Sequence, residues 1–213
     1  MEIITTTSLT KYFGTTAATD NISVHVNEGE IYGFLGLNGA GKTTLIRMLL
    51  GMIKPDSGSV RLFGKPVSRD FDIWNEVGYL VETPHGYPNL SVNENLQVYY
   101  QLRRLKKPAW VDEIICKLKL EKYRHKKEKF LSLGNKQRLG LAKALVHQPK
   151  LLILDEPING LDPEGIVEVR SLLLELAAKG TTIFLSSHIL GEISKLAHRI
   201  GIIHRGRLVK ELT

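Results

Sequence analysis

A glycine-rich loop lies between an apolar run and a helical pattern near the start of this 213-residue chain. Residues 36–43 read Gly-Leu-Asn-Gly-Ala-Gly-Lys-Thr, after the strand-like run Ile31–Leu35 and before a helical pattern over residues 44–50. The sequence G-x-x-x-x-G-K-[ST] in a strand–loop–helix context is the pattern of a phosphate-binding loop. The alternative is an ordinary glycine-rich turn, but four specified positions in this context favour a loop that binds phosphate.

Each residue type in the loop has a chemical reason to be there. Gly36, Gly39 and Gly41 allow the backbone to curl so that its N–H groups point at phosphate oxygens, and the following helix adds its positive N-terminal end. We expect Lys42 to reach the β- and γ-phosphates and to act in catalysis, and the Thr43 hydroxyl to ligate Mg²⁺. The remaining nucleotide contacts of the loop are expected from Asn38, Ala40 and Thr44.

Two acidic residues follow a second apolar run, Leu151–Leu154. If this strand ends beside the phosphate loop, Asp155 would bind Mg²⁺ directly or through water, and Glu156 would orient and deprotonate an attacking water. The two carboxylates alternate across the strand, so they can serve different atoms. An apolar strand that ends in acids is common by itself, and the phosphate loop is what makes this pair informative.

Strands and helices alternate along the chain in a way that predicts an α/β fold. The continuous apolar strands favour a mostly parallel sheet covered on both faces, in a P-loop NTPase core of the RecA-like kind. Turn-rich β-type runs fill the first 80 residues and predict an N-terminal antiparallel β subdomain. We expect one domain over 1–213, with its nucleotide-binding core in 1–83 and 146–213 and a helical insertion in 84–145. The expected strands are Glu2–Thr6, Ile22–Val26, Ile31–Leu35, Ser59–Phe63, Val77–Val81, Leu151–Leu154, Thr181–Leu185 and a final Ile200–His204, and the expected helices are Val92–Leu105, Ala109–Leu120, Lys136–His147, Glu164–Ala178 and Ile189–Leu196.

Positive charge is concentrated in the helical insertion. Residues 84–145 hold 14 Lys and Arg against 5 Asp and Glu, in a chain whose formal net charge is +7. Such a segment could face anionic lipid, nucleic acid or an acidic partner, although a solvated helical face is the simpler explanation. No aromatic residues interleave with the basic run 122–127 in a base-stacking pattern, which weakens the nucleic-acid interpretation.

The single cysteine and the hydropathy pattern bear on the compartment. We interpret Cys116 as a reduced core thiol of a cytoplasmic protein, since it has no partner for a disulfide within the chain. No N-terminal run is typical of a signal peptide, and no run approaches the roughly 20 apolar residues needed to span a bilayer. Any membrane function would therefore act through a partner.

The residues before the second acidic motif add a family resemblance. Residues 131–138 read Leu-Ser-Leu-Gly-Asn-Lys-Gln-Arg, and with the two motifs above they resemble the ATP-binding subunit of an ABC transporter over essentially the whole chain. The family pattern is Leu-Ser-Gly-Gly-Gln, of which Leu131, Ser132 and Gly134 are kept, whereas Leu133 and Asn135 depart from it. In that family the loop reaches across a head-to-tail dimer to hold the γ-phosphate of the other subunit's ATP. Without the resemblance, Ser132 would be interpreted as a helix cap.

The resemblance implies roles for further residues. His188 matches the switch histidine that touches the γ-phosphate, although a histidine after a strand is often only a polar loop residue. Asp162 matches the aspartate carried across the dimer, and it also suits a turn that begins a helix at Pro163. Phe13, with Tyr12 as second choice, is expected to stack on adenine. The alternative for these rings is an exposed position in an edge loop.

Glu82 departs from the family, which usually has glutamine after the strand Val77–Val81. We expect it to contact Mg²⁺ and the nucleotide, and its charge near Asp155, Glu156 and ATP should raise its own pKa unless the metal is bound. A glutamate here, together with the altered signature loop, resembles exporters that protect bacteria against peptide antibiotics, namely bacitracin-resistance and lantibiotic-immunity systems. The alternative is a neutral variant in an unrelated exporter.

The resemblance implies an ATPase that uses ATP and Mg²⁺, forms an ATP-dependent head-to-tail homodimer and acts on integral membrane permease subunits, without binding nucleic acid. Such a subunit would be cytoplasmic and peripheral at the inner face of the membrane. Two other functions stay open at this stage: an ABC-type ATPase that acts on ribosomes or DNA, and a nucleotide-sensing regulator without turnover. The chain lacks the second cassette or long coiled coil typical of the first, and Glu156 and His188 argue against the second.

Overall fold

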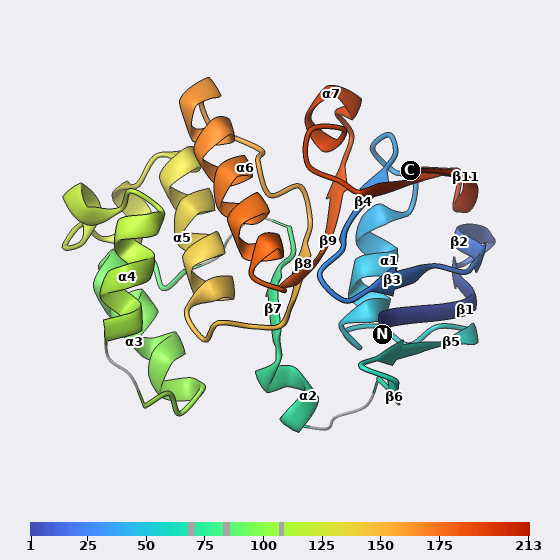
Figure 1. The fold of residues 1–213 in the computed structure, drawn as a ribbon, viewed down its shortest axis with the longest axis horizontal. Helices are drawn as coiled ribbons and strands as arrows, with labels where there is room; N and C mark the ends of the chain where they lie inside the picture. Colours follow the sequence, from blue (N-terminus) through green and yellow to red (C-terminus); the bar gives the residue numbers. More distant parts are fainter. Residues whose placement is uncertain (68–70, 83–85, 107–108) are drawn as a thin grey trace.

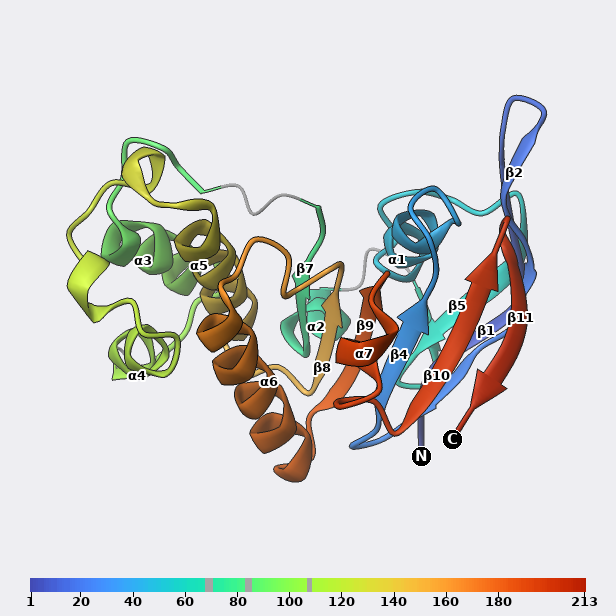
Figure 2. The same cartoon turned by 90° about the horizontal axis from the view of Figure 1, so that it is seen from above.

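A six-stranded sheet in the order β11-β10-β4-β9-β8-β7 forms the centre of the molecule (Figures 1 and 2). The computed structural model describes residues 1–67, 71–82, 86–106 and 109–213. Five neighbouring strands of this sheet are parallel, and β11 alone runs antiparallel, as a hairpin with β10. Their bounds are β4 Ile31–Leu35, β7 Val77–Leu80, β8 Leu151–Leu154, β9 Thr182–Ser187, β10 Arg199–His204 and β11 Arg207–Leu212.

The central sheet is covered on both faces because its strands are apolar on both sides. Along β8, Leu151 and Ile153 belong to one buried cluster, whereas Leu152 and Leu154 belong to the other. This alternation follows from the period of two in a strand. The first cluster joins the sheet to helix α1 (Lys42–Leu49) and the N-terminal strands. The second joins it to α6 (Pro163–Ala178), α7 (Leu190–Ile193) and the helical insertion.

A second, antiparallel sheet lies on the α1 side of the molecule, as Figure 2 shows. Its long first strand pairs with three others, and β5 also pairs with β6. The bounds are β1 Glu2–Phe13, β2 Thr16–Ile22, β3 His25–Asn27, β5 Ser57–Leu62 and β6 Lys65–Pro66. The mixed α/β fold with a mostly parallel sheet and an N-terminal antiparallel part is therefore confirmed.

Three helices lie in the described part of the segment predicted as the insertion, and they lie together at one end of the molecule (Figure 1). They are α3 Val92–Leu102, α4 Ala109–Lys117 and α5 Leu133–Leu145, and two short 3₁₀ turns at 121–123 and 128–130 connect α4 with α5. Helix α3 begins at a capping box in which Ser91 and Glu94 each accept from the other's backbone N–H. The expected edge of the insertion at residues 83 and 84 lies outside the described residues, so the division of the domain stays a prediction. A further short helix, α2, spans Phe71–Asn75.

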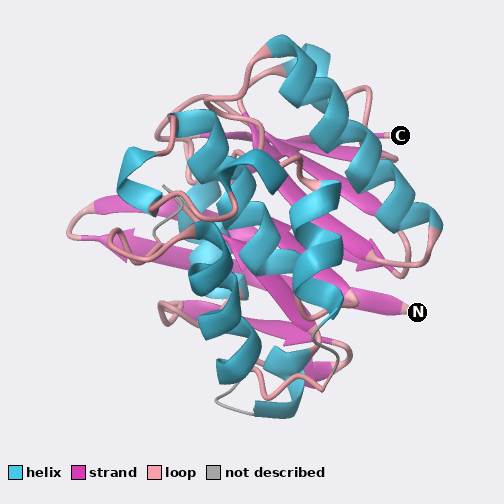
Figure 3. Cartoon of the chain, turned by 90° about the vertical axis from the view of Figure 1, so that its left-hand side faces the viewer, coloured by secondary structure: helices cyan, strands magenta, loops and turns pink. Residues whose placement is uncertain are grey.

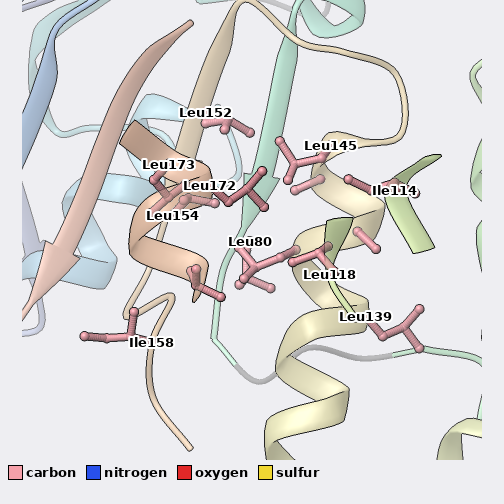
Figure 4. Packing of buried hydrophobic residues seen from close by; sticks show 14 of the residues in the cluster. Leu80, Ile114, Leu118, Leu139, Leu145, Leu152, Leu154, Ile158, Leu172 and Leu173 are labelled. Atoms are coloured by element: carbon pink, nitrogen blue, oxygen red, sulfur yellow. The ribbon is translucent and has the colours of Figure 1, made fainter. Parts of the chain in front are cut away.

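The insertion packs on the central sheet through aliphatic side chains. Figure 3 shows the helices stacked against the strands, and the close view in Figure 4 shows the contact itself. Leu152 and Leu154 of β8 belong to one buried cluster with side chains of α4, α5 and α6. Cys116 does not take part: it is exposed on α4, so its interpretation as a core thiol is wrong. In a helix of 3.6 residues per turn, the buried residues 114, 115 and 118 place residue 116 on the opposite side.

Several expected bounds were wrong, and each has a local cause. The expected strand Ile22–Val26 is divided between β2 and β3, because β1 is irregular at Ser8, which has a φ of 47°, and its two halves pair with different strands. The helix expected over 189–196 is only the single turn of α7. Residues 200–204 are not the final strand, since β11 follows through a two-residue turn in which Arg205 and Gly206 both have positive φ.

Candidate active site

The glycine-rich loop forms a cradle between β4 and the start of α1. Gly39 and Gly41 have φ of 79° and 110°, in the region where a side chain is strained. A Cβ atom on Gly41 would lie 2.2 Å from the carbonyl oxygen of Ala18, so the backbone there has no room for one. No side chain caps α1 at Gly41. The amides of its first turn are thereby available to an anion.

Lys42 is buried under this cradle with only 6% of its side chain exposed. Its Nζ donates to the carbonyl oxygens of Gly36 (2.7 Å) and Leu37 (3.2 Å). The same ammonium lies 3.3 Å from Oε1 of Glu156. The lysine is therefore held at the floor of the loop by groups that a phosphate could replace.

Asp155 is held by two hydroxyl groups at the end of β8. Thr43 Oγ1 donates to Asp155 Oδ2 (2.7 Å), and Ser186 Oγ donates to Asp155 Oδ1 (2.5 Å). Ser186, on the neighbouring strand β9, also accepts from the backbone N–H of Glu156 (3.0 Å). One buried serine thus orients both acidic residues. Sequence reasoning missed it, although a small polar residue at the end of an otherwise apolar strand was a usable signal.

Glu156 turns out of the strand direction with a φ of 48°, a strained conformation for a residue with a side chain. Its Oε2 lies 2.9 Å from Nδ1 of His188. Its Oε1 is buried and has no hydrogen-bond partner among the described residues, although it faces the Lys42 ammonium. Gln137 of α5 donates to the carbonyl oxygens of Glu156 (3.2 Å) and Pro157 (2.9 Å), so the insertion also reaches this site. Gln137 was not among the residues predicted from sequence.

The structure brings most of the predicted loop and acidic residues around one hollow. Its lining is Ala18, Asn38, Gly39, Gly41, Lys42, Thr43, Thr44, Asp155 and Glu156. Gly36 lies beneath it as an acceptor for Lys42, and Ala40 is buried with its N–H bonded to the Leu37 carbonyl. The strained glycine cradle, the uncapped helix and the Glu156 oxygen that accepts no hydrogen bond among the described residues fit a nucleoside triphosphate with a bound cation.

Three predicted residues lie elsewhere. Ser132, Gly134 and Asp162 line a second hollow between the starts of α5 and α6. There Ser132 Oγ accepts from Asn135 N (3.3 Å) and Asp162 Oδ1 accepts from Gly165 N (3.0 Å), so both act as helix caps. The cap alternatives therefore describe these two residues within one copy of the chain, and their contact with phosphate stays a prediction.

The two candidate aromatic residues are on the β1–β2 hairpin. Tyr12 is 47% and Phe13 54% exposed, and neither is among the described residues that line the Lys42 hollow. The Lys11 ammonium lies 5.9 Å from the centre of the Phe13 ring. Both rings are available for stacking, and the choice between them stays a prediction.

Glu82 follows β7 with a φ of 60° and forms an ion pair with Arg47 of α1. It lines a shallow hollow that also includes Thr43, Asp155 and Glu156. Among the described residues no three His, Cys, Asp or Glu side chains are grouped as a metal site. A magnesium ion here would take the Thr43 and Asp155 oxygens, with phosphate oxygens, waters and the predicted ligand Glu82 as the other candidates.

The comparison with known proteins follows from this geometry. The family model described as ABC transporter matches residues 19–159, which include the cradle, the acidic pair and Ser132. The chain belongs to the ABC transporter family. Its fold supports this: a solved ATP-binding subunit of an ABC transporter, 28% identical, superposes with a TM-score of 0.90 over 99% of this chain and 90% of that one. A nucleotide-free cassette from an ABC transporter, also 28% identical, gives 0.86 over 99% and 91%.

Curated relatives are more similar in sequence. The bacitracin transport ATP-binding protein BcrA of Bacillus licheniformis is 49% identical over 99% of this ABC subunit and 69% of its own length. The same protein of Enterococcus faecalis is 48% identical over the same shares. The lantibiotic transport ATP-binding protein SrtF of Streptococcus pyogenes is 38% identical over 96% of this chain and 88% of its own length.

This ABC subunit binds ATP and hydrolyses it, as sequence analysis predicted. The interpretations as a ribosome- or DNA-associated ATPase or as a nucleotide sensor are not supported. Within the described part of the chain, no helix is both long enough and apolar enough to cross a bilayer.

Proposed function

We propose that this ABC subunit powers the export of an amphipathic peptide antibiotic and so confers resistance or immunity. The observation that carries the proposal is the 49% identity to a bacitracin transport protein, together with an intact acidic pair beside the phosphate loop. The 38% identity to a lantibiotic transport protein supports the same class of cargo. Glu82 in place of the usual glutamine is consistent with this group of exporters.

The residues of the site have separate roles in this proposal. Lys42 exchanges its carbonyl acceptors for the β- and γ-phosphates. Thr43 and Asp155 would hold Mg²⁺, which when bound would offset phosphate charge. Glu156 accepts a proton from the water that attacks the γ-phosphorus, while the bond to the β–γ bridging oxygen breaks. His188, 2.9 Å from Glu156, keeps that carboxylate in position and contacts the γ-phosphate.

The working unit in this proposal is an ATP-dependent head-to-tail homodimer. Ser132, Gly134 and Asp162 lie outside the Lys42 hollow. In the dimer they would face the nucleotide of the second copy from the N-terminal ends of α5 and α6. Phe13, or Tyr12, stacks on adenine from the β1–β2 hairpin. Such a dimer would dock on integral permease subunits and lie in the cytoplasm, at the inner face of the membrane. The basic charge of residues 84–145 is compatible with anionic lipid there.

Resistance assays test this function directly. The gene is expressed in a sensitive host together with genes for candidate permease subunits, and the inhibitory concentrations of bacitracin and of lantibiotics are measured. We expect a rise of severalfold for at least one of these peptides. Glu156→Gln is the matched control, because it keeps size and hydrogen bonding while it removes the base. Equal sensitivity of the native and Glu156→Gln strains to every peptide would reject peptide export.

Purified protein tests the catalytic assignment separately. Glu156→Gln should lower steady-state phosphate release by about 10²–10⁴-fold, the usual contribution of a general base, while ATP binding persists. Lys42→Ala should weaken ATP binding itself. Phosphate release by Glu156→Gln at the native rate would exclude Glu156 as the base.

A further inference from the structure

Three carboxylates converge on one shallow hollow beside Thr43, namely Glu82, Asp155 and Glu156. Glu156 has a cation 3.3 Å away in Lys42, and Glu82 has one in Arg47. Asp155 accepts hydrogen bonds from two uncharged hydroxyl groups, and no ion pair to it is found among the described residues. The cluster therefore has an excess of one negative charge, centred at the residue expected to hold a cation.

Arg47 occupies a particular place relative to this cluster. It lies four residues after Thr43 on α1, so the two side chains share one face of the helix. Glu82, two residues after the end of β7, forms an ion pair with Arg47 and also lines the hollow with Thr43 and Asp155. The pair is partly solvated, with 36% of the Arg47 and 54% of the Glu82 side chain exposed. A pair in this setting exchanges partners at little cost in free energy.

We propose that Arg47 is a positioning residue that competes with a divalent cation for the Glu82 carboxylate. While Arg47 holds Glu82, the third negative charge of the cluster is neutralised and does not oppose the phosphates of ATP. When a cation is bound at Thr43 and Asp155, Glu82 is drawn away from Arg47. The contact thus sets how strongly the nucleotide affinity depends on Mg²⁺. The inference rests on the magnesium site of the proposed function.

A double-mutant cycle on nucleotide binding tests this competition without any turnover. The dissociation constant of a fluorescent, hydrolysis-resistant ATP analogue is measured in EDTA and in saturating Mg²⁺ for the native protein, Arg47→Gln, Glu82→Gln and the double variant. The readout is the ratio of the EDTA value to the Mg²⁺ value. If Arg47 acted only through its charge, Arg47→Gln would change this ratio by the same factor in the native protein and in Glu82→Gln. If Arg47 competes for Glu82, the substitution changes the ratio mainly in the protein that keeps the Glu82 carboxylate.

We expect Arg47→Gln to raise the ratio of the two dissociation constants when Glu82 is present. The factor of this rise should be about three times the factor measured in the Glu82→Gln background, which is the coupling typical of a partly exposed ion pair. Arg47→Lys should restore most of the native ratio. Arg61→Gln, which removes an exposed cation on β5 of the other sheet, should leave it unchanged. Thermal unfolding without nucleotide confirms that each variant is folded.

Equal factors in the two backgrounds, or no change in either, would overturn the inference while leaving the proposed function intact. A native protein that binds the analogue equally well in EDTA and in Mg²⁺ would reject the magnesium site, and with it this inference. That outcome is recognised from the native protein alone, so the two failures are distinguishable.

Discussion

At the scale of single residues, Ser186 connects the two acidic residues of the active site. Its hydroxyl donates to Asp155 and accepts from the Glu156 amide, and its side chain is fully buried. Ser186→Ala leaves a buried carboxylate oxygen and a backbone N–H without this partner, which should lower the free energy of unfolding by about 1–3 kcal/mol. Urea denaturation measures this change.

The same substitution should lower catalytic activity beyond its effect on stability, since both carboxylates lose their common support. Ser187→Ala is the matched control, because Ser187 is also buried and its hydroxyl accepts from Ile189 N rather than from the site. If the two variants had equal rates of ATP hydrolysis when fully folded, the positioning role of Ser186 would be excluded.

At the scale of elements, helix α5 of the insertion packs directly against the central sheet at Gly78 of β7. A Cβ atom there would lie 2.1 Å from the carbonyl oxygen of Ala144 in α5, and backbone cannot yield as a flexible side chain does. Gly78→Ala should therefore destabilise the protein by about 1–3 kcal/mol through overpacking, measured by urea denaturation. Gly191→Ala is the control, since a Cβ on that α7 glycine has nothing within 4 Å. Equal stability of the two variants would contradict this close packing.

A buried histidine forms a hydrogen bond between the end of α5 and β7 and makes this contact sensitive to acid. His147, just after α5, has Nε2 3.0 Å from the Val77 carbonyl at the start of β7. Burial, with a smaller contribution from the charge of Arg103, lowers the pKa of His147 to about 4 against the opposing effect of the Val77 hydrogen bond. The folded protein thus prefers neutral His147, whereas the unfolded chain takes up a proton near pH 6.5.

Stability from this group is complete above about pH 6.5 and is lost as the pH falls toward 4, because the unfolded state then binds more protons. The loss amounts to about 3 kcal/mol at the low end of that window. His147→Gln keeps a donor for Val77 but does not titrate. Denaturation curves at several pH values should show that the free energy of unfolding falls less in the variant between pH 6.5 and 4, by about this amount. Parallel pH profiles of the native protein and the variant would refute the assignment.

At the scale of the whole molecule, the two groups of nucleotide-binding residues line different hollows. The Lys42 hollow and the Ser132 hollow have no described residue in common, and in the proposed dimer each copy supplies one of the two sets to a given ATP. Glu156→Gln should therefore be monomeric without nucleotide and dimeric with ATP in sedimentation velocity, because hydrolysis no longer separates the copies. Lys42→Ala combined with Glu156→Gln should stay monomeric. Dimers formed equally well without ATP would contradict this assembly.

Local chemistry was enough to predict the α/β class and to mark the glycine-rich loop and the acidic pair, which the fold brings around one hollow. The glycines that permit positive φ, the lysine and the threonine must be adjacent in the chain, because a single loop has to wrap one phosphate group. Continuous apolar runs such as Leu151–Leu154 likewise indicate strands buried on both faces without knowledge of their neighbours. Family resemblance added His188, whose contact with Glu156 the structure contains.

Tertiary structure alone decided which distant residues support the site and where helices and strands end. Ser186, Gln137 and Arg47 reach the acidic cluster from three separate elements, and no spacing in the chain marks such contacts. The exposure of Cys116 depended on which face of α4 packs on the core. The division of residues 22–26 depended on β1, whose two halves pair with different strands. A sequence pattern reports the preferences of neighbouring residues, whereas these outcomes are set by contacts between segments that only folding brings together.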